Sequence, residues 1–164
     1  MKRKKHVAKR GREEGNYSAS AAGLAFKHGF YLETAWILSV IFEKKSKSLL
    51  KKLEPRHLLP GYSFEQSIKR IKYHHLSGRV PQLGLHLELN LIEEMRSWKN
   101  SRNTMLKDMV SVHVSKNRME RLASEGIALY KRWNKSLKLI KAEMKKSTIH
   151  KIQKVNKQVD EEQP

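Results

Sequence analysis

Apolar residues recur with the period of an α-helix through most of this 164-residue chain, and that period limits the fold more than any other feature. Within residues 19–53 the steps of three, four and seven residues join Leu24, Tyr31, Ala35, Leu38, Phe42, Leu49 and Leu53. A helix that is apolar over so much of its circumference is expected to lie centrally in a bundle. Pro55 and Pro60 are expected to end it. The lysines that suit its C-terminal end are Lys44, Lys45, Lys47, Lys51 and Lys52.

Capping patterns predict where the second and third helices begin. Ser63 and Gln66 have the spacing of a capping box, in which each side chain bonds a free backbone N–H of the other residue. The stretch 77–81 contains a glycine and a proline and is expected to end this second helix. Asn90 and Glu93 repeat the capping pattern and predict the start of the third helix.

A fourth helix is predicted from about Ser115 to Lys146, where apolar residues step by three and four throughout. The only alternation typical of a strand, from Val110 to Val114, is too short to force a sheet. We therefore expect an all-α fold, a four- or five-helix and mostly antiparallel bundle.

The strongly basic composition points to a polyanion partner. The bundle is expected over residues 19–146, between a disordered basic arm at 1–18 and a helix extension that frays over 147–164. The formal net charge of the chain is +19, and residues 19–146 contain 25 of its basic and 11 of its acidic residues. So basic a body favours nucleic acid as partner. The alternative is a charged surface that serves solubility alone.

Composition also excludes several classes of protein. The chain has no cysteine, so it can form neither a disulfide framework nor a thiolate zinc site, and it has no cysteine nucleophile. The most apolar window, 19–42, contains Lys27, His28 and Glu33, each costly in a bilayer, so we expect a cytoplasmic protein without a membrane span. The histidines follow no metal-ligand spacing, and we expect neither a metal nor another cofactor.

Arg102 is the first candidate functional residue, because periodicity places it on the core-facing line of the third helix, four residues after Trp98. Burying an unpaired guanidinium is costly, so such a residue needs a partner or a cleft. The helix could bend or end near residues 100–101 and turn the side chain outward. Alternatively, the arginine could form a buried ion pair, for example with Glu33 or Glu65. The functional alternative is a groove in which its planar fork holds a phosphate.

The residues around Arg102 resemble a known family. The run Trp98-Lys99-Asn100-Ser101-Arg102-Asn103, preceded by Leu91-Ile92-Glu93-Glu94-Met95, is similar to the signature helix of HEPN domains. These are all-helical bundles of bacterial toxin–antitoxin and defence systems, and many are ribonucleases. The resemblance covers the order of helices over about 20–146 and motif residues over about 91–109.

The resemblance implies a site and a reaction. The family motif is an arginine, then a polar residue, then a histidine after four to six intervening positions, and it implies metal-free RNA cleavage in which the 2′-hydroxyl attacks the adjacent phosphate. Arg102 matches the arginine and Asn103 the polar residue. Residues 107–109 contain no histidine, and His113 could take that role only if the helix broke near Met109 and folded back. The resemblance also implies a homodimer, whose two motif helices form a shared groove.

Basic side chains supply the remaining candidates. Lys99 and Lys107 on the third helix are candidate nucleic-acid contacts. The fourth helix carries a broad positive strip of Lys131, Arg132, Lys135, Lys138, Lys141 and Lys145. Such a strip would bind phosphates without much sequence preference, and the alternative is a solvated face.

Three hypotheses follow from these patterns. The first is a HEPN-like domain acting on RNA, with metal-independent endonuclease activity as a candidate. The second is a non-catalytic module that binds RNA, DNA or an acidic partner protein. The third is a structural or regulatory interaction protein.

Overall fold

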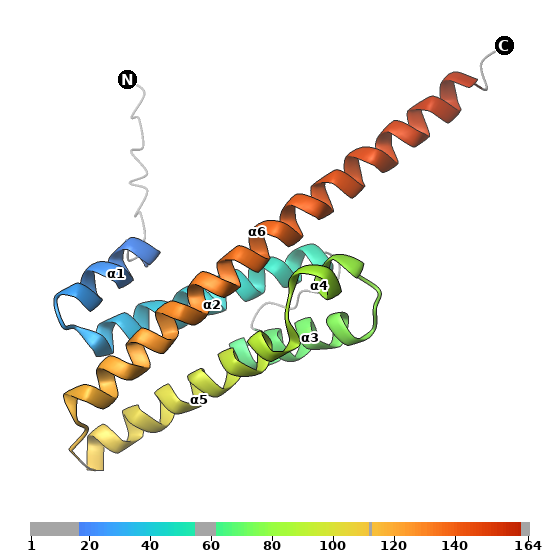
Figure 1. The fold of residues 1–164 in the computed structure, drawn as a ribbon. Coiled ribbons are helices and arrows are strands. Elements are labelled where there is room, and N and C mark those ends of the chain that lie inside the picture. Colours follow the sequence, from blue (N-terminus) through green and yellow to red (C-terminus); the bar gives the residue numbers. More distant parts are fainter. Residues whose placement is uncertain (1–16, 55–61, 112, 162–164) are drawn as a thin grey trace, which may run out of the picture.

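The regular structure of this chain is helical. The computed structural model describes residues 17–54, 62–111 and 113–161, with side chains as far as residue 147. Within these ranges there is no strand, so the all-α prediction is confirmed. In place of the four or five helices expected, the same ranges hold six (Figure 1), namely α1 (Ala19–Lys27), α2 (Tyr31–Leu53), α3 (Phe64–Leu76), α4 (Pro81–His86), α5 (Leu89–Ser111) and α6 (Lys116–Glu161). None of the described helices combines the length and apolar character that crossing a membrane requires. The basic arm predicted at 1–18 lies, except for its last two residues, outside the described ranges.

The single long helix predicted over 19–53 is two helices, α1 and α2, separated by a reversal of the chain. Gly29 has a φ of 77°, in the left-handed region that glycine adopts most readily. Its N–H donates to the Phe26 carbonyl oxygen and the Phe30 N–H donates to the Ala25 carbonyl oxygen, which is the Schellman arrangement that ends helices. The apolar stripe continues on both sides of this turn, so periodicity alone did not reveal the break.

The bundle mixes parallel and antiparallel neighbours, whereas a mostly antiparallel arrangement was expected. Phe42 of α2 contacts Tyr130 of α6. Three residues further along α2, Lys45 contacts Asn134, which is four residues further along α6. The two helices therefore run in the same direction. Helix α5 runs opposite to both (Figure 1). A parallel pair needs a long connection, and here α3, α4 and α5 provide it.

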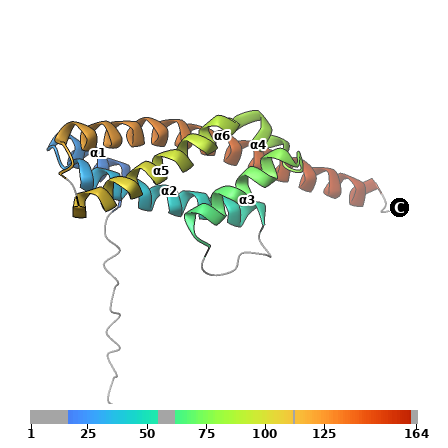
Figure 2. The same cartoon turned by 90° about the horizontal axis from the view of Figure 1, so that it is seen from below.

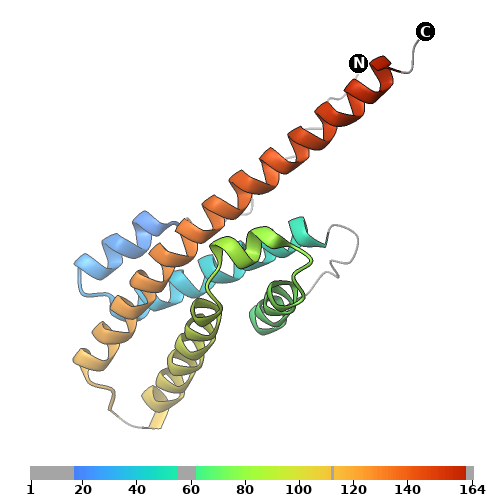
Figure 3. The same cartoon turned by 45° about the vertical axis from the view of Figure 1, so that its right-hand side comes forward.

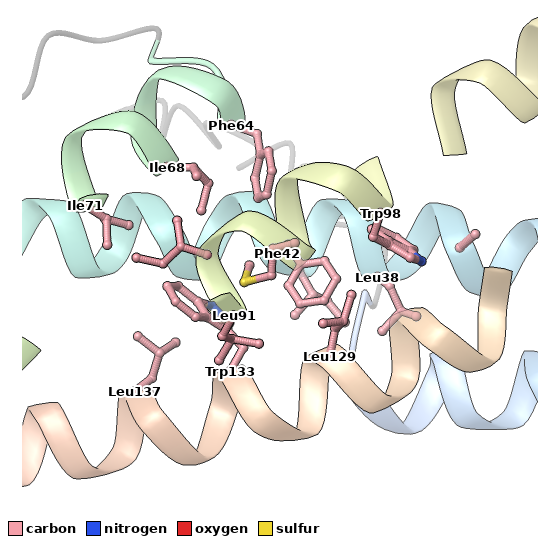
Figure 4. Close-up of a cluster of buried hydrophobic side chains, with 14 of the residues drawn as sticks. Leu38, Phe42, Phe64, Ile68, Ile71, Leu91, Trp98, Leu129, Trp133 and Leu137 are labelled. Atoms are coloured by element: carbon pink, nitrogen blue, oxygen red, sulfur yellow. The ribbon is translucent and has the colours of Figure 1, made fainter. Parts of the chain in front are cut away.

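Trp98 of α5 lies at a close crossing of α5 and α6 in the core. Its indole N–H donates to the Leu122 carbonyl oxygen of α6 at 2.8 Å, and its ring meets that of Phe42 edge-on, with 5.3 Å between the ring centroids. Gly126 permits this approach, since a Cβ added there would lie 2.6 Å from the nearest indole carbon. Figure 4 shows Trp98, Phe42 and Trp133 among the buried side chains between α2, α5 and α6.

One of the two predicted capping boxes is present. The Ser63 hydroxyl oxygen accepts from the Gln66 backbone N–H at 3.2 Å, and the Gln66 side-chain oxygen accepts from the Ser63 N–H at 2.8 Å. The third helix starts close to the predicted position, since α5 begins at Leu89, one residue before Asn90. Asn90 and Glu93 both lie inside α5, so they do not form the predicted cap.

The last helix is longer than its apolar pattern. Helix α6 begins after Ser115, whose hydroxyl accepts from the Arg118 backbone N–H at 3.3 Å. It continues past Lys146 to Glu161, and Figures 2 and 3 show its C-terminal part projecting beyond the other helices. The short helix α4, which the sequence did not predict, supports α6 through a 3.2 Å hydrogen bond from Gln82 to Ser147. The end of the predicted fraying tail, 162–164, lies outside the described ranges.

Candidate functional site

Arg102 lies half-buried between α5 and α2. Helix α5 runs through residues 100–101 to Ser111, so it does not end before Arg102 as one alternative required. The guanidinium carbon lies 4.8 Å from the centroid of the Trp36 ring, and Nη1 donates to the Asn103 side-chain oxygen at 3.0 Å. Burial lowers the pKa of Arg102, because leaving water disfavours the charged form.

The ion pair that one alternative gave to Arg102 is not formed among the described residues. Among the described residues no carboxylate lies within salt-bridge distance of it, and Glu65, one suggested partner, pairs with Arg96 at 2.7 Å. Arg102 instead lines a cleft.

That cleft is a small pocket between α2 and α5, with a volume of about 160 Å³, which we call the α2–α5 pocket. Its lining residues are Trp36, Ser39, Val40, Phe42, Glu43, Phe64, Trp98, Lys99 and Arg102. The Lys99 ammonium lies 4.6 Å from the centroid of the Phe64 ring. Burial lowers the pKa of Lys99, although the charges of Glu43 and Glu65 oppose this shift. The pocket thus combines an aromatic lining with two partly desolvated cations.

His113 does not reach this pocket. Helix α5 continues unbroken through Met109, so the chain does not fold back there, and His113 follows the end of the helix as an exposed residue. At 1.5 Å per residue, the end of α5 at Ser111 lies about 14 Å along the axis from Arg102. The structure therefore brings Arg102 and Asn103 together and leaves His113 apart from them. Lys107 is likewise exposed and does not line the pocket.

Arg132 differs from the lysines of the positive strip on α6 because it is paired with two carboxylates. Its two terminal nitrogens donate to Glu94 at 2.5 Å and to Glu88 at 2.9 Å. These hydrogen bonds raise its pKa, because they favour the charged form. The neighbouring Lys131 and Lys135 are exposed and make no ion pair among the described residues.

The other lysines of the strip lie beside two lysines of α2. On α6 the spacing i, i+3 and i+7 places three lysines on one face of the helix, namely Lys138, Lys141 and Lys145. On α2, Lys45 and Lys52 are seven residues apart, close to two full turns, so they also share a face. We call these five residues the lysine rows. The parallel contact of Lys45 with Asn134 aligns the two rows side by side.

Lys45 is the member of the α2 row that contacts α6. Burial lowers the pKa of Lys45, and the positive charges of Lys141 and then Lys138 lower it further. Its ammonium donates to the neutral Asn134 side-chain oxygen at 2.9 Å. In the described part of the chain no carboxylate forms an ion pair with any member of the lysine rows.

Five ion pairs join carboxylates to basic side chains outside the lysine rows. These pairs are Arg70–Glu54, Lys72–Glu93, Arg96–Glu65, Arg118–Asp108 and Arg132–Glu94. As far as the described residues extend, the positive charge of the lysine rows is consequently left without a protein counter-ion. No group of three or more histidine, aspartate or glutamate side chains within the described ranges is placed to hold a metal ion.

Sequence reasoning missed Trp36 and the α2 row. Lys45 and Lys52 stand out in the sequence, but the helix dipole is a sufficient explanation for lysines near the end of a helix. Nothing in the sequence indicated that this row would lie beside the lysines of α6, or that Trp36 would contact Arg102 in the pocket.

Comparison with known proteins finds no family model, no curated protein and no solved structure that matches this chain.

Proposed function

We propose that this protein is an RNA-binding module whose main contact surface is the lysine rows of α2 and α6. The observation that carries the proposal is the alignment of five lysines on two parallel helices with no carboxylate partner among the described residues. Like charges at this spacing repel one another, and a phosphate backbone relieves the repulsion while releasing its own counter-ions. Contacts of this kind position a nucleic acid without reading its sequence.

The choice of RNA over DNA is supported by the HEPN-like residues around Arg102. With that resemblance come the other parts of the proposal, which are a place in a toxin–antitoxin or defence system, a cytoplasmic location and assembly as a homodimer. An acidic partner protein is the competing occupant of the same lysines, and it would show the same salt dependence without any affinity for RNA.

The test is the affinity for a labelled single-stranded RNA, measured by fluorescence anisotropy over a range of salt. Five phosphate contacts on a single strand predict a log–log slope of about −3.5. Raising the salt from about 50 to about 200 mM should therefore weaken binding by about 100-fold. Affinity that does not change with salt would contradict the proposal.

A matched pair of variants locates the surface. In Lys138→Gln/Lys141→Gln the slope should shrink to about −2, because two phosphate contacts are lost. The control is Lys27→Gln/Lys116→Gln, which removes the same charge from exposed positions at the end of α1 and the start of α6. Equal weakening in the two double variants would show that only net charge matters and that the lysine rows are not the contact.

Metal-independent RNA cleavage is a second candidate function, favoured by one observation. Arg102 is half-buried beside Asn103 and has no carboxylate partner in the described part of the chain, so it is free to stabilise a phosphate. Incubation of labelled RNA without metal, with Arg102→Ala and His113→Ala in parallel, tests it. Cleavage that depends on Arg102 would establish a ribonuclease, and the His113 variant would show whether that histidine moves the proton. Salt-sensitive binding without cleavage would leave the binding module.

A further inference from the structure

We infer that Lys45 is a modification site, at which the side-chain nitrogen takes up an acyl group from a small anionic donor of the acyl phosphate class. The inference is carried by the position of Lys45 between the two lysine rows, where an anionic donor and a nucleophilic nitrogen would meet. The reaction itself does not depend on RNA. Only its effect on RNA affinity rests on the function proposed above.

The first argument is the set of contacts that hold the Lys45 nitrogen. Nζ donates to the Asn134 side-chain oxygen at 2.9 Å and lies 5.6 Å from the centroid of the Tyr130 ring. Both partners belong to α6, and neither is a carboxylate. Within the described ranges Lys45 forms no ion pair, so its ammonium is held against a neighbouring helix without a counter-ion to stabilise the charge.

The second argument is that these surroundings favour the neutral amine. Acyl transfer needs this form, because an ammonium has no lone pair with which to attack. Burial lowers the pKa of Lys45, and the positive charges of Lys141 and Lys138 lower it further. Partial loss of water and a neighbouring cation are the two conditions that activate lysine as a nucleophile, and Lys45 meets both.

The third argument is that the same lysines attract the donor. Lys138 and Lys145 are exposed and Lys141 is half-buried, so the α6 row presents its charge to solvent beside Lys45. Charges of one sign grouped on a surface raise the local concentration of small ions of the opposite sign. In an acyl phosphate the dianionic phosphate is bonded directly to the carbonyl group that reacts. Lysines that hold the phosphate therefore bring the reactive carbon close to the amine.

The transfer balances without any further reactant. The ammonium first releases a proton to water, and the nitrogen lone pair then attacks the carbonyl carbon of the acyl phosphate. A C–N bond forms and the C–O bond to the phosphate breaks, so the phosphate leaves with the electron pair of that bond. The proton that the nitrogen loses on becoming an amide goes to the departing phosphate. Lys45 ends as a neutral amide, and inorganic phosphate is released.

The primary test is incubation of the full chain with acetyl phosphate, followed over time by peptide mass spectrometry of each lysine. Lys45 should be acetylated about tenfold faster than Lys27, which is exposed at the end of α1 and lies outside the rows. Lys99 is the comparison for burial alone. Burial lowers its pKa as well, but the charges of Glu43 and Glu65 oppose the shift, so Lys99 should react more slowly than Lys45. Equal rates at Lys45 and Lys27 would overturn the inference.

Variants and a second reagent assign the preference to the lysine rows. Lys141→Gln should slow acetylation of Lys45 by about threefold or more, because it removes a cation that attracts the donor and disfavours the ammonium. Lys116→Gln removes the same charge from the exposed start of α6 and should leave the rate unchanged. With the uncharged N-hydroxysuccinimide ester of acetic acid, the preference for Lys45 over Lys27 should shrink. An unchanged rate in Lys141→Gln, or the same preference with both reagents, would overturn the inference.

A last arm separates failure of the inference from failure of the proposed function. Acetylation removes one of five phosphate contacts, so the log–log salt slope of RNA binding should change from about −3.5 to about −2.8. Bound RNA should in turn protect Lys45 from acetyl phosphate. Preferential acetylation of Lys45 without protection by RNA would support the inference and count against RNA contact at the rows. Salt-dependent RNA binding with acetylation spread evenly over the lysines would overturn the inference and leave the binding module intact.

Discussion

Replacement of Gly126 by alanine sets helix propensity against packing at the Trp98 crossing. Propensity alone predicts that alanine stabilises the middle of a helix by about 1 kcal/mol. The added Cβ, however, would lie 2.6 and 2.8 Å from two indole carbons and 2.9 Å from the Leu38 Cδ1. The ring has little freedom to withdraw, because it is hydrogen-bonded to the Leu122 carbonyl and packed edge-on against Phe42. Overpacking of this kind costs about 3 kcal/mol, so the net effect should be a loss of about 2 kcal/mol.

The assay is urea unfolding followed by circular dichroism. The midpoint should fall with little change in slope, and the thermal midpoint should drop by about 4–8 °C. Gly23→Ala is the matched control in α1, where an added Cβ meets nothing within 4 Å and should stabilise the protein by up to about 1 kcal/mol. In a Trp98→Phe background the cost of Gly126→Ala should shrink, because the smaller ring leaves room. A Gly126→Ala protein at least as stable as the wild type would refute the packing argument.

Three further predictions concern a turn, a buried carboxylate and a paired arginine. Gly29→Ala should lower the free energy of unfolding by about 1 kcal/mol, because Gly29 has a left-handed φ, and unchanged urea midpoints would contradict this. Burial raises the pKa of Glu54, but hydrogen bonds from His74 and Arg70 outweigh burial and leave it lowered. Its contribution to stability is therefore complete above the usual carboxyl pKa of about 4.3 and is lost as the pH falls through the lower pKa of the folded state. The wild type should consequently lose more stability in acid than Glu54→Gln does. Parallel curves of unfolding free energy against pH for the two proteins would be inconsistent with this linkage. Arg132→Gln should leave RNA affinity within about twofold, because two carboxylates already bind the guanidinium; a large loss of affinity would return Arg132 to the contact surface.

Local signals in the sequence predicted local structure well. The capping box at Ser63 needs only residues three apart, so it could be recognised without knowing the fold. The turn at Gly29 was missed although it is also local, because the apolar stripe keeps its period across it. A lone glycine inside a helical pattern is common enough that it did not outweigh the stripe.

Contacts between distant helices were beyond the sequence. Periodicity placed Arg102 on an inward-facing line, and the structure does hold it half-buried, but the identity of its neighbour depends on how α2 lies against α5. The same limit applies to the positive strip of α6. Its members are equivalent on one helix taken alone. The register of the neighbouring helices separates Arg132, which is paired, from the lysines of the strip, which have no ion pair within the described ranges.

The parallel pairing of α2 with α6 has a consequence for how fast the chain can fold. The contact between Lys45 and Asn134 closes a loop of 89 residues, whereas α1 with α2, and α5 with α6, are neighbours along the chain. Closing a long loop costs entropy before the contacts it brings can repay that cost, and proteins rich in such contacts fold more slowly than simple up-and-down bundles. Docking of α2 onto α6 is thus expected to be the rate-limiting step. Substitutions at this interface should slow refolding in stopped-flow measurements, and those confined to the α1–α2 turn should act mainly on unfolding.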